Sequence, residues 1–467
     1  MALDLDLLFH PRSVAVIGVS PDPRRFGGNA WVRTMQAQGF KGALYPVDTR
    51  TGEFNGLKVY PSIEEVPGSI DLVVSSIPAQ FTPQLVRECI AKGVKFIEFF
   101  TAGFTETGDD ADAMLEKELT QIAKTGDVRF VGPNCMGVYC PSCGISWRSD
   151  LPTESGSVAV MAQSGLNGVK IVLSGVNRGV YFSKFVSYGN ASDLNEIDFL
   201  DYFAADEESS IITAYIEGVR DGRKFLEAIR QAAKTKPAVV LKGGRTGAGT
   251  RAVFSHTASL AGSEDIWESS IKQAGAICVY DVDEMIDTVM ALQYLTAPRN
   301  RNVAVIGSGG GLSVLAADHC EDAGLKVPKF PPEVREEIGK LMPKAGSFPD
   351  NPVDSPLLGN LDKFGQIVRI LNDHDDIGSM ILHFEVDTTL VFQGRETITE
   401  ITRAVIEMVG ECTKPVAVVL LTVGSSGSVQ AINEEQAEYA RARIPVYPTI
   451  ARAAQAIHKL IEYHYGN

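Results

Sequence analysis

The sequence predicts an α/β protein built from three doubly wound parallel-sheet domains in series. Short runs rich in β-branched residues alternate with longer amphipathic segments along almost the whole chain, which is typical of parallel strands joined by crossover helices. The apolar runs are continuous rather than alternating, as expected for strands that are covered on both faces. The length of 467 residues corresponds to about three domains at roughly 150 residues each.

The first block, from about Leu7 to Pro152, has the element order of a mononucleotide-binding sheet. Strands are predicted at Ser13–Gly18, Ala43–Val47, Leu72–Ser76, Val94–Phe99 and Val128–Val131, with helices at about Asn29–Gln38, Thr82–Lys92 and Asp110–Lys124.

The second block begins at Gly156. Its predicted strands are Ser157–Ala162, Tyr181–Ser187, Ile211–Ile216, Ala238–Leu241 and Ala276–Tyr280, and its predicted helices are Ser164–Ser174 and Asp283–Leu295. A glycine-rich loop is expected over Gly243–Gly262, and a polar linker over Thr296–Arg301.

The third block repeats the same pattern. Strands are predicted at Asn302–Ile306, Ser379–His383 and Val416–Leu421, with helices from Leu312, at Arg395–Val409 and at Gln430–Ala442.

Composition excludes several classes of protein. With 45% hydrophobic and 22% charged residues, the chain is not predominantly disordered. A net charge of −15 argues against a general nucleic-acid or anionic-membrane surface, and no apolar run approaches the roughly 18–20 residues of a membrane-spanning helix. The N-terminus carries acids where a secretory signal carries bases, which predicts a cytoplasmic protein. Seven cysteines, an odd number in a long chain, argue against a disulfide framework.

The loop after the first strand, Gly18–Gly28, lies between a strand and a helix, where backbone amides favour an anion. It lacks the GxGxxG dinucleotide fingerprint, and Pro21 and Pro23 remove two amide donors. Arg24 and Arg25 could contact phosphate. Two interpretations stay open: a βα turn without a ligand, or the site of a phosphate-rich ligand other than NAD.

Gln163-Ser164-Gly165 follows the strand Ser157–Ala162. A serine at such a junction is most often a helix N-cap. The same geometry also presents a hydroxyl and free amides to a phosphate. The spacing is not GxSxG, so a hydrolase nucleophile is not expected.

His256 lies in the glycine-rich stretch, among small and hydroxyl residues. An isolated histidine there is usually solvated, yet a neutral imidazole is also a competent nucleophile toward phosphoryl groups. Such a role needs a carboxylate to orient the ring. Glu217, at the end of the strand Ile211–Ile216, is a candidate, although a surface acid at a strand end is an equal alternative.

Two other patterns resemble binding motifs. Cys135, Cys140 and Cys143 have part of an iron–sulfur spacing, but the next cysteine is Cys278. Gly307–Gly311 reads GSGGG and lacks the Gly-Lys-Ser/Thr ending of a P-loop. No metal site is therefore predicted, and the glycine run is expected to be a turn.

Taken together, seven collinear stretches resemble the alpha subunits of NDP-forming acyl-CoA synthetases, ADP-forming acetyl-CoA synthetase among them, and more distantly the succinyl-CoA synthetase alpha subunit. They cover nearly the whole chain, and the most specific combination is the histidine loop with YIEG and GPNC. The stretches are LFHPRSVAVIG (Leu8–Gly18), TAGFTETG (Thr101–Gly108), GPNCMG (Gly132–Gly137), AQSG (Ala162–Gly165), YIEGVRDGRKF (Tyr215–Phe225), LKGGRTGAGTRAVFSHTASLAG (Leu241–Gly262) and NPVD (Asn351–Asp354).

The resemblance implies a role for each block. Residues 1–152 would form a CoA-binding Rossmann-like domain, 153–298 a flavodoxin-like phosphohistidine domain, and 299–467 an additional flavodoxin-like domain. His256 would be phosphorylated during turnover, Glu217 would hydrogen-bond its ring, and Gln163, Ser164 and Gly165 would bind the phosphoryl group. Coenzyme A would lie against Gly18, Ser20, Arg25, Gly27, Val47, Arg50, Ile77, Pro78 and Asn134.

The chain departs from the family pattern in two places. Asp48-Thr49-Arg50 stands where Asn-Pro-Lys is usual, which adds an anion beside a phosphate-rich ligand, and Ala258 stands where glycine is common. The resemblance implies the interconversion of acyl-CoA, phosphate and NDP with a carboxylic acid, CoA and NTP.

No Walker A or ATP-grasp segment is found in the sequence, so Mg²⁺ and ADP/ATP are expected on a separate ATP-grasp beta subunit in a hetero-oligomer. Two rival hypotheses are a non-catalytic CoA- or acyl-CoA-binding regulatory subunit, and an NAD-linked dehydrogenase. The missing GxGxxG disfavours the second rival.

Overall fold

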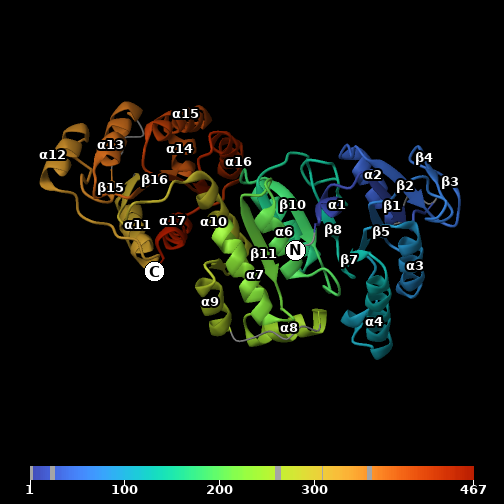
Figure 1. Cartoon of the computed structure of the whole chain (residues 1–467). Helices are drawn as coiled ribbons and strands as arrows, with labels where there is room; N and C mark the ends of the chain where they lie inside the picture. The colour runs from blue at the N-terminus through green and yellow to red at the C-terminus, as the bar shows by residue number, and fades with distance from the viewer. Residues whose placement is uncertain (1–3, 21–26, 258–263, 308, 355–359, 467) are drawn as a thin grey trace. The chain divides into compact units, whose positions relative to one another are not determined.

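The computed structural model describes residues 4–20, 27–257, 264–307, 309–354 and 360–466, with the side chains of residues 253–257 outside the description (Figure 1). The chain forms two compact units. One contains Met1–Val176 and Tyr181–Val282, and the other contains Asn177–Val180 and Asp283–Asn467. None of the helices in the described ranges combines the length and apolar character that crossing a bilayer needs.

The first sheet, drawn in blue to teal in Figure 1, has five parallel strands in the order β2-β1-β5-β6-β7. The order reverses between β1 and β5, and the carboxyl ends of such strands are where ligands bind in doubly wound sheets. The strands are β1 (Ser13–Ile17), β2 (Ala43–Val47), β5 (Leu72–Ser75), β6 (Phe96–Phe99) and β7 (Arg129–Val131); the helices are α1 (Asp6–Phe9), α2 (Gly28–Ala37), η1 (Ala79–Phe81), α3 (Thr82–Lys92), η2 (Thr105–Thr107) and α4 (Asp110–Thr125); and β3 (Gly52–Phe54) pairs with β4 (Leu57–Val59) in a hairpin.

The second sheet has the order β13-β12-β11-β9-β10-β8 and reverses between β9 and β11. The sequence predicts no strand at β8 (Gly137–Tyr139), which pairs antiparallel to β10 at the sheet edge. The other strands are β9 (Val158–Ala162), β10 (Phe182–Ser187), β11 (Ile211–Ile216), β12 (Ala238–Lys242) and β13 (Ile277–Val279), and the helices are α5 (Gly165–Val176), α6 (Glu196–Ala205), α7 (Gly222–Thr235), α8 (Gly247–Thr257) and α9 (Glu264–Gln273).

Helix α8 corrects the expectation of a loop over the whole stretch Gly243–Gly262. Residues Gly247–Thr257 are helical, and the stretch places His256 in the last turn of that helix. The hydroxyl of Thr246 accepts a hydrogen bond from the Gly249 amide at 3.1 Å, as a helix-capping side chain does. The cap and the helix formers Ala248, Arg251 and Ala252 outweigh the cost of glycine in the first turn.

The second unit holds the third sheet, β15-β14-β16-β17-β18, again with the order reversing beside its first strand. Alternate residues of β14 pack into different cores, Ile306 into one and Val305 into the other, because helices cover both faces. The strands are β14 (Val303–Gly307), β15 (Val353–Asp354), β16 (Ser379–Glu385), β17 (Val416–Leu421) and β18 (Val446–Tyr447), and the helices are α10 (Val282–Tyr294), α11 (Gly310–Asp322), α12 (Pro332–Leu341), α13 (Leu361–Asp373), α14 (Val386–Phe392), α15 (Arg395–Glu411), α16 (Ser426–Arg441) and α17 (Ile450–Tyr465).

The structure thus has the predicted class, three doubly wound α/β sheets in series. The domain limits at 152/153 and 298/299 stay predictions.

Candidate active site at the strand ends of the first two sheets

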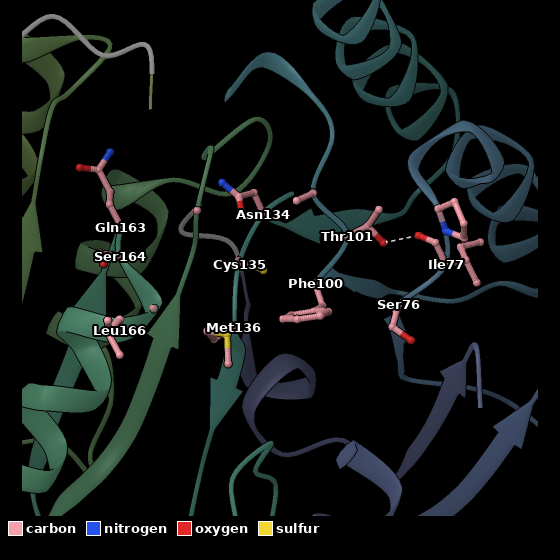
Figure 2. Close-up of a pocket in the computed structure, with 14 residues that line it drawn as sticks. Ser76, Ile77, Phe100, Thr101, Asn134, Cys135, Met136, Gln163, Ser164 and Leu166 are labelled. Carbon is pink, nitrogen blue, oxygen red and sulfur yellow. Dashed lines mark hydrogen bonds between the residues drawn. The ribbon is translucent and has the colours of Figure 1, made fainter. Parts of the chain in front are cut away.

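A cavity of about 530 Å³ lies in the first unit, at the carboxyl ends of strands from both of its sheets (Figure 2). It brings together six residues predicted from the sequence: Ile77, Pro78, Asn134, Gln163, Ser164 and Gly165. Figure 2 shows Gln163 and Ser164 on one side, Ile77 and Thr101 on the other, and Asn134 and Met136 between them. Segments far apart in the sequence therefore meet at one hollow.

Gln163 is the link across the switch point of the second sheet. It follows β9, is only 7% exposed, and hydrogen-bonds the backbone that follows the neighbouring strand β11. Its Oε1 accepts from the amides of Glu217 and Gly218, and its Nε2 donates to the Gly218 carbonyl at 2.9 Å. The side-chain amide of Gln163 therefore holds the ends of β9 and β11 together.

Ser164 and Gly165 form the corner where α5 begins. The Ser164 Oγ accepts from the Asn167 amide at 3.4 Å, a long N-cap bond, and its carbonyl accepts from Gly168 at 3.0 Å. A Cβ on Gly165 would lie 2.2 Å from Cγ of Met136, so only glycine lets the helix start so close to that segment. The first amides of a helix have no intrahelical acceptors, and here they adjoin the cavity and favour an anion.

Glu217 is 5% exposed and ends β11 beside this corner. Its Oε1 accepts from the Tyr215 hydroxyl at 3.2 Å, and its backbone carbonyl accepts from the ammonium of Lys242. Burial lowers the pKa of Lys242, and its Nζ lies 5.5 Å from the centre of the Trp267 ring. Glu217 is therefore a buried carboxyl group in a polar cluster and not a solvated acid at a strand end.

The predicted pairing of Glu217 with His256 stays a prediction, because the His256 side chain lies outside the described residues. The backbone of α8 packs against η2, which follows the cavity-lining segment Phe100–Ala102. The helix that carries His256 therefore belongs to the same region of the first unit.

Asn134 occupies the left-handed region, with φ of 57°, and its amide donates to the Thr101 carbonyl at 2.9 Å. Its side chain donates to Oδ1 of Asn190 at 3.3 Å. Thr101 in turn donates to the Ile77 carbonyl at 2.8 Å, the dashed line in Figure 2. These bonds connect four loops around the cavity.

The described ends of the predicted loop, residues 18–20 and 27–28, lie beside this cavity wall and are not among its lining residues. Gly18 donates to the Val47 carbonyl at 2.9 Å, and Gly28 donates to Oγ of Ser76 at 2.8 Å. A Cβ on Gly18, which has φ of +92°, would approach that Oγ to 2.9 Å. Glycine is therefore needed where the loop crosses the end of β5, and Ser76 does line the cavity.

Of the other residues predicted on this loop, Arg25 lies outside the described residues. The amide of Ser20 donates to Oδ1 of Asn29 at 2.7 Å, and Gly27 has φ of +116°.

Arg50 is paired within its own loop. Its Nε and Nη2 contact the two carboxylate oxygens of Asp48 at 2.9 and 3.2 Å, and Arg50 does not line the cavity. Asp48 stands where the resemblance leads one to expect asparagine, and Arg50 stands where it leads one to expect lysine. These two residues form an ion pair with each other.

Sequence reasoning missed several residues that line the cavity. The signal for some of them was present, since Ser76 and Phe100–Ala102 directly follow strands of the first sheet. The missed residues are Ser76, Phe100, Thr101, Ala102, Cys135, Met136, Leu166 and Gly189.

Two family models match the chain. One, described as a CoA binding domain, matches residues 12–141, and one described as a succinyl-CoA ligase like flavodoxin domain matches residues 155–292. The first range contains every strand of the first sheet, and the second contains every strand of the second sheet except β8.

Relatives match the chain over nearly its full length. The alpha subunit of the ADP-forming acetate–CoA ligase II of Pyrococcus furiosus is 34% identical over 460 residues, which is 98% of this chain and 97% of the relative. The ADP-forming acetate–CoA ligase I of Archaeoglobus fulgidus is 35% identical over 374 residues, 80% of this chain but 54% of that longer protein.

A solved structure has the same fold. The dinucleotide-forming acetyl-coenzyme A synthetase 1 of Candidatus Korarchaeum cryptofilum, in complex with phosphate and ADP, superimposes with a TM-score of 0.85 at 32% identity, over 98% of this chain and 97% of that one.

Proposed function

The chain belongs to the family of ADP-forming acetate–CoA ligase alpha subunits, and on that premise we propose that it catalyses acyl transfer between CoA and phosphate and then carries the phosphoryl group on His256. The overall reaction converts acyl-CoA, phosphate and ADP into a carboxylic acid, CoA and ATP. The observation that carries the proposal is the shared cavity, in which the start of α5 adjoins the strand ends of the CoA-binding sheet.

The first step is attack of phosphate on the thioester carbonyl. The C–S bond breaks, CoA leaves as the thiol, and an acyl-phosphate forms. The amides at the start of α5 and the Ser164 hydroxyl would hold the phosphoryl oxygens, so charge that develops on them is stabilised by donors already in place.

In the second step, an imidazole nitrogen of His256 attacks phosphorus and the carboxylate leaves. A neutral ring is required, and Glu217 would orient it by accepting its other N–H. The phosphohistidine then gives its phosphoryl group to ADP. Both steps depend mainly on positioning and charge neutralisation.

CoA would lie with its thiol end at the cavity, beside Ile77, Pro78 and Asn134, and its nucleotide along the loops that contain Gly18, Ser20, Arg25, Gly27, Val47 and Arg50. The match to a CoA binding domain over residues 12–141 supports this placement. The Asp48–Arg50 pair weakens the positive charge available to its phosphates.

We propose an ATP-grasp beta subunit as the nucleotide-binding partner, with Mg²⁺ and ADP/ATP on that subunit. The word alpha in the names of the full-length relatives supports a second subunit. The longer Archaeoglobus relative supports it too, because this chain matches only 54% of that protein. A cytoplasmic location is proposed with it.

A labelling experiment separates this enzyme from a regulatory CoA-binding subunit. The chain is incubated with acetyl-CoA and radiolabelled phosphate, with His256→Ala as the test variant and His319→Ala, at an exposed position on α11, as the matched control. We expect an acid-labile phosphoryl group on wild type and on the control, and none on His256→Ala. A regulatory subunit would bind CoA and stay unlabelled.

A further inference from the structure

Three side chains with metal-ligand atoms converge at a site in the first unit, outside the cavity described above. His10, Cys140 and Glu208 each offer one atom, and these atoms lie within 4.8 Å of one another. The Nε2 of His10 is 3.5 Å from the Cys140 sulfur and 3.3 Å from a Glu208 carboxylate oxygen. The three come from separate segments: the end of α1, the turn after β8, and the turn between α6 and β11.

These separations fit a tetrahedral zinc ion. Zinc bonds are about 2.3 Å to sulfur, about 2.0 Å to imidazole nitrogen and about 2.0 Å to carboxylate oxygen. At a tetrahedral angle, such bonds place nitrogen roughly 3.5 Å from sulfur and roughly 3.3 Å from oxygen. The two observed distances from Nε2, 3.5 and 3.3 Å, match these values, and the sulfur and the oxygen lie within 4.8 Å of each other.

The atoms around the cluster also orient the ligands. The other ring nitrogen of His10, Nδ1, lies 3.0 Å from Oδ1 of Asp6. A carboxylate only accepts, so Nδ1 keeps its proton, and a bound ion would replace the proton on Nε2. Zinc-binding histidines commonly have such a carboxylate partner. Lys184, whose side chain is fully buried, donates to the same Glu208 oxygen, Oε2, that lies nearest His10.

We propose that His10, Cys140 and Glu208 form a Zn²⁺ site, with water as the fourth ligand. A mixed thiolate, imidazole and carboxylate set is typical of zinc. The neighbouring Cys143 is not a ligand, because its sulfur donates to the Phe9 carbonyl at 3.1 Å. The ion joins the N-terminal helix to two turns of the second sheet.

Cobalt binding tests the site directly. The full chain is stripped with a chelator under reducing conditions and titrated with Co²⁺, whose thiolate charge-transfer band and intense tetrahedral ligand-field bands report sulfur ligation and geometry. We expect both signals at one Co²⁺ per chain, with displacement by Zn²⁺. Cys140→Ser should lose the charge-transfer band. The matched control is Cys412→Ser, which removes a half-buried cysteine at the end of α15 and should keep it.

A second variant distinguishes ligation from a folding defect. Asp6→Asn leaves all three ligands in place and removes the carboxylate behind His10, so we expect zinc affinity to fall by about 10–100-fold with an unchanged far-ultraviolet spectrum. Zinc should also raise the melting temperature of wild type and not that of Cys140→Ser. The proposal is wrong if stoichiometric Co²⁺ gives no tetrahedral spectrum with wild type, or if Cys140→Ser keeps the charge-transfer band. It is also wrong if the cysteines of wild type instead form a Cys140–Cys143 disulfide that leaves Zn²⁺ unbound.

Discussion

Glu98 is a buried acid on β6 with a structural role that the sequence did not indicate. It is 1% exposed, and its carboxylate oxygens accept from Nε1 of Trp31 and the amide of Val138, each at 3.1 Å. Burial raises the pKa of Glu98 to about 8. A Cβ on Gly137 would lie 1.7 Å from its carboxyl carbon, so glycine at 137 makes room for it.

We predict that Glu98 makes the stability of the chain depend on pH. Because its pKa is higher in the folded chain than in the unfolded chain, folding takes up a proton. The unfolding free energy should therefore fall as pH rises from about 5 to 8, by up to about 1.4 kcal/mol per pH unit from this group. Urea unfolding at several pH values, compared with Glu98→Gln, measures it.

The control for this experiment is Glu53→Gln, at an exposed position on β3. The stability difference between wild type and Glu98→Gln should shrink or reverse with rising pH, whereas that between wild type and Glu53→Gln should stay constant. Parallel pH curves for wild type and Glu98→Gln would contradict the assignment.

The Asp48–Arg50 pair predicts a gain of affinity from a single substitution. Asp48→Asn releases the Arg50 guanidinium and removes an anion beside the proposed CoA phosphates. The Arg50 side chain of this pair is 54% exposed, and a solvent-screened pair is worth up to about 1 kcal/mol, so the Kd for CoA should fall by up to about fivefold at low salt. Calorimetric titration measures it, and the gain should shrink at high salt.

Arg50→Gln is the opposing control and should weaken CoA binding. If Asp48→Asn binds CoA no better than wild type, the phosphates of CoA do not lie beside Arg50.

At the scale of elements, two neighbouring residues between β9 and α5 have different roles. Gln163 positions the backbone, and Ser164 is proposed to contact the phosphoryl group. Gln163→Leu leaves buried backbone groups of Glu217 and Gly218 without their partners, so we expect about 2–4 kcal/mol of destabilisation together with loss of activity. Ser164→Ala removes only a long capping bond and should cost less than about 1 kcal/mol, yet it should lower kcat.

Chemical unfolding and steady-state kinetics on both variants test this division. A Ser164→Ala enzyme with normal kcat would show that the hydroxyl does not contact the phosphoryl group.

Helices and strands whose ends are marked by clear sequence signals have the bounds that the sequence predicts. Helix α3 runs over Thr82–Lys92 as predicted, because Pro83 lies in its first turn and Gly93 ends it in the left-handed conformation. Strand β11 is the continuous apolar run Ile211–Ile216. By contrast, β8 has only three residues and exists through its pairing with β10, a tertiary effect that no local pattern carries.

At the scale of the whole molecule, the sequence predicts those cavity residues that a local pattern or a family motif marks, and not those that only tertiary packing brings to the cavity. The end of the strand before Gln163 is visible in the sequence, so Gln163 could be proposed as a neighbour of a ligand. Ile77 was proposed only from the family resemblance. Met136 could not be proposed, because its place on the cavity wall depends on the close approach of α5 at Gly165. The proposed metal cluster was missed because its ligands, from His10 to Glu208, span nearly 200 residues of the sequence and meet only through folding.

If ADP and ATP bind only to the proposed partner subunit, the isolated chain can carry out only the first two steps of the reaction. With acetyl-CoA and phosphate alone it should become phosphorylated, but with ADP added it should form no ATP. Co-purification with an ATP-grasp subunit from the same organism should restore ATP formation, measured with a luciferase assay. ATP formed by the isolated chain, or an ATP-grasp subunit that neither associates nor restores activity, would contradict the proposed partner.

Residue-level mass spectrometry of the working complex tests the proposed phosphoryl relay most directly. Samples quenched in alkali after addition of acetyl-CoA and phosphate should carry a phosphoryl group on the peptide that contains His256, and a chase with ADP should remove it at the rate of turnover. A His256 peptide that stays unmodified throughout, with turnover surviving His256→Ala, would contradict the account.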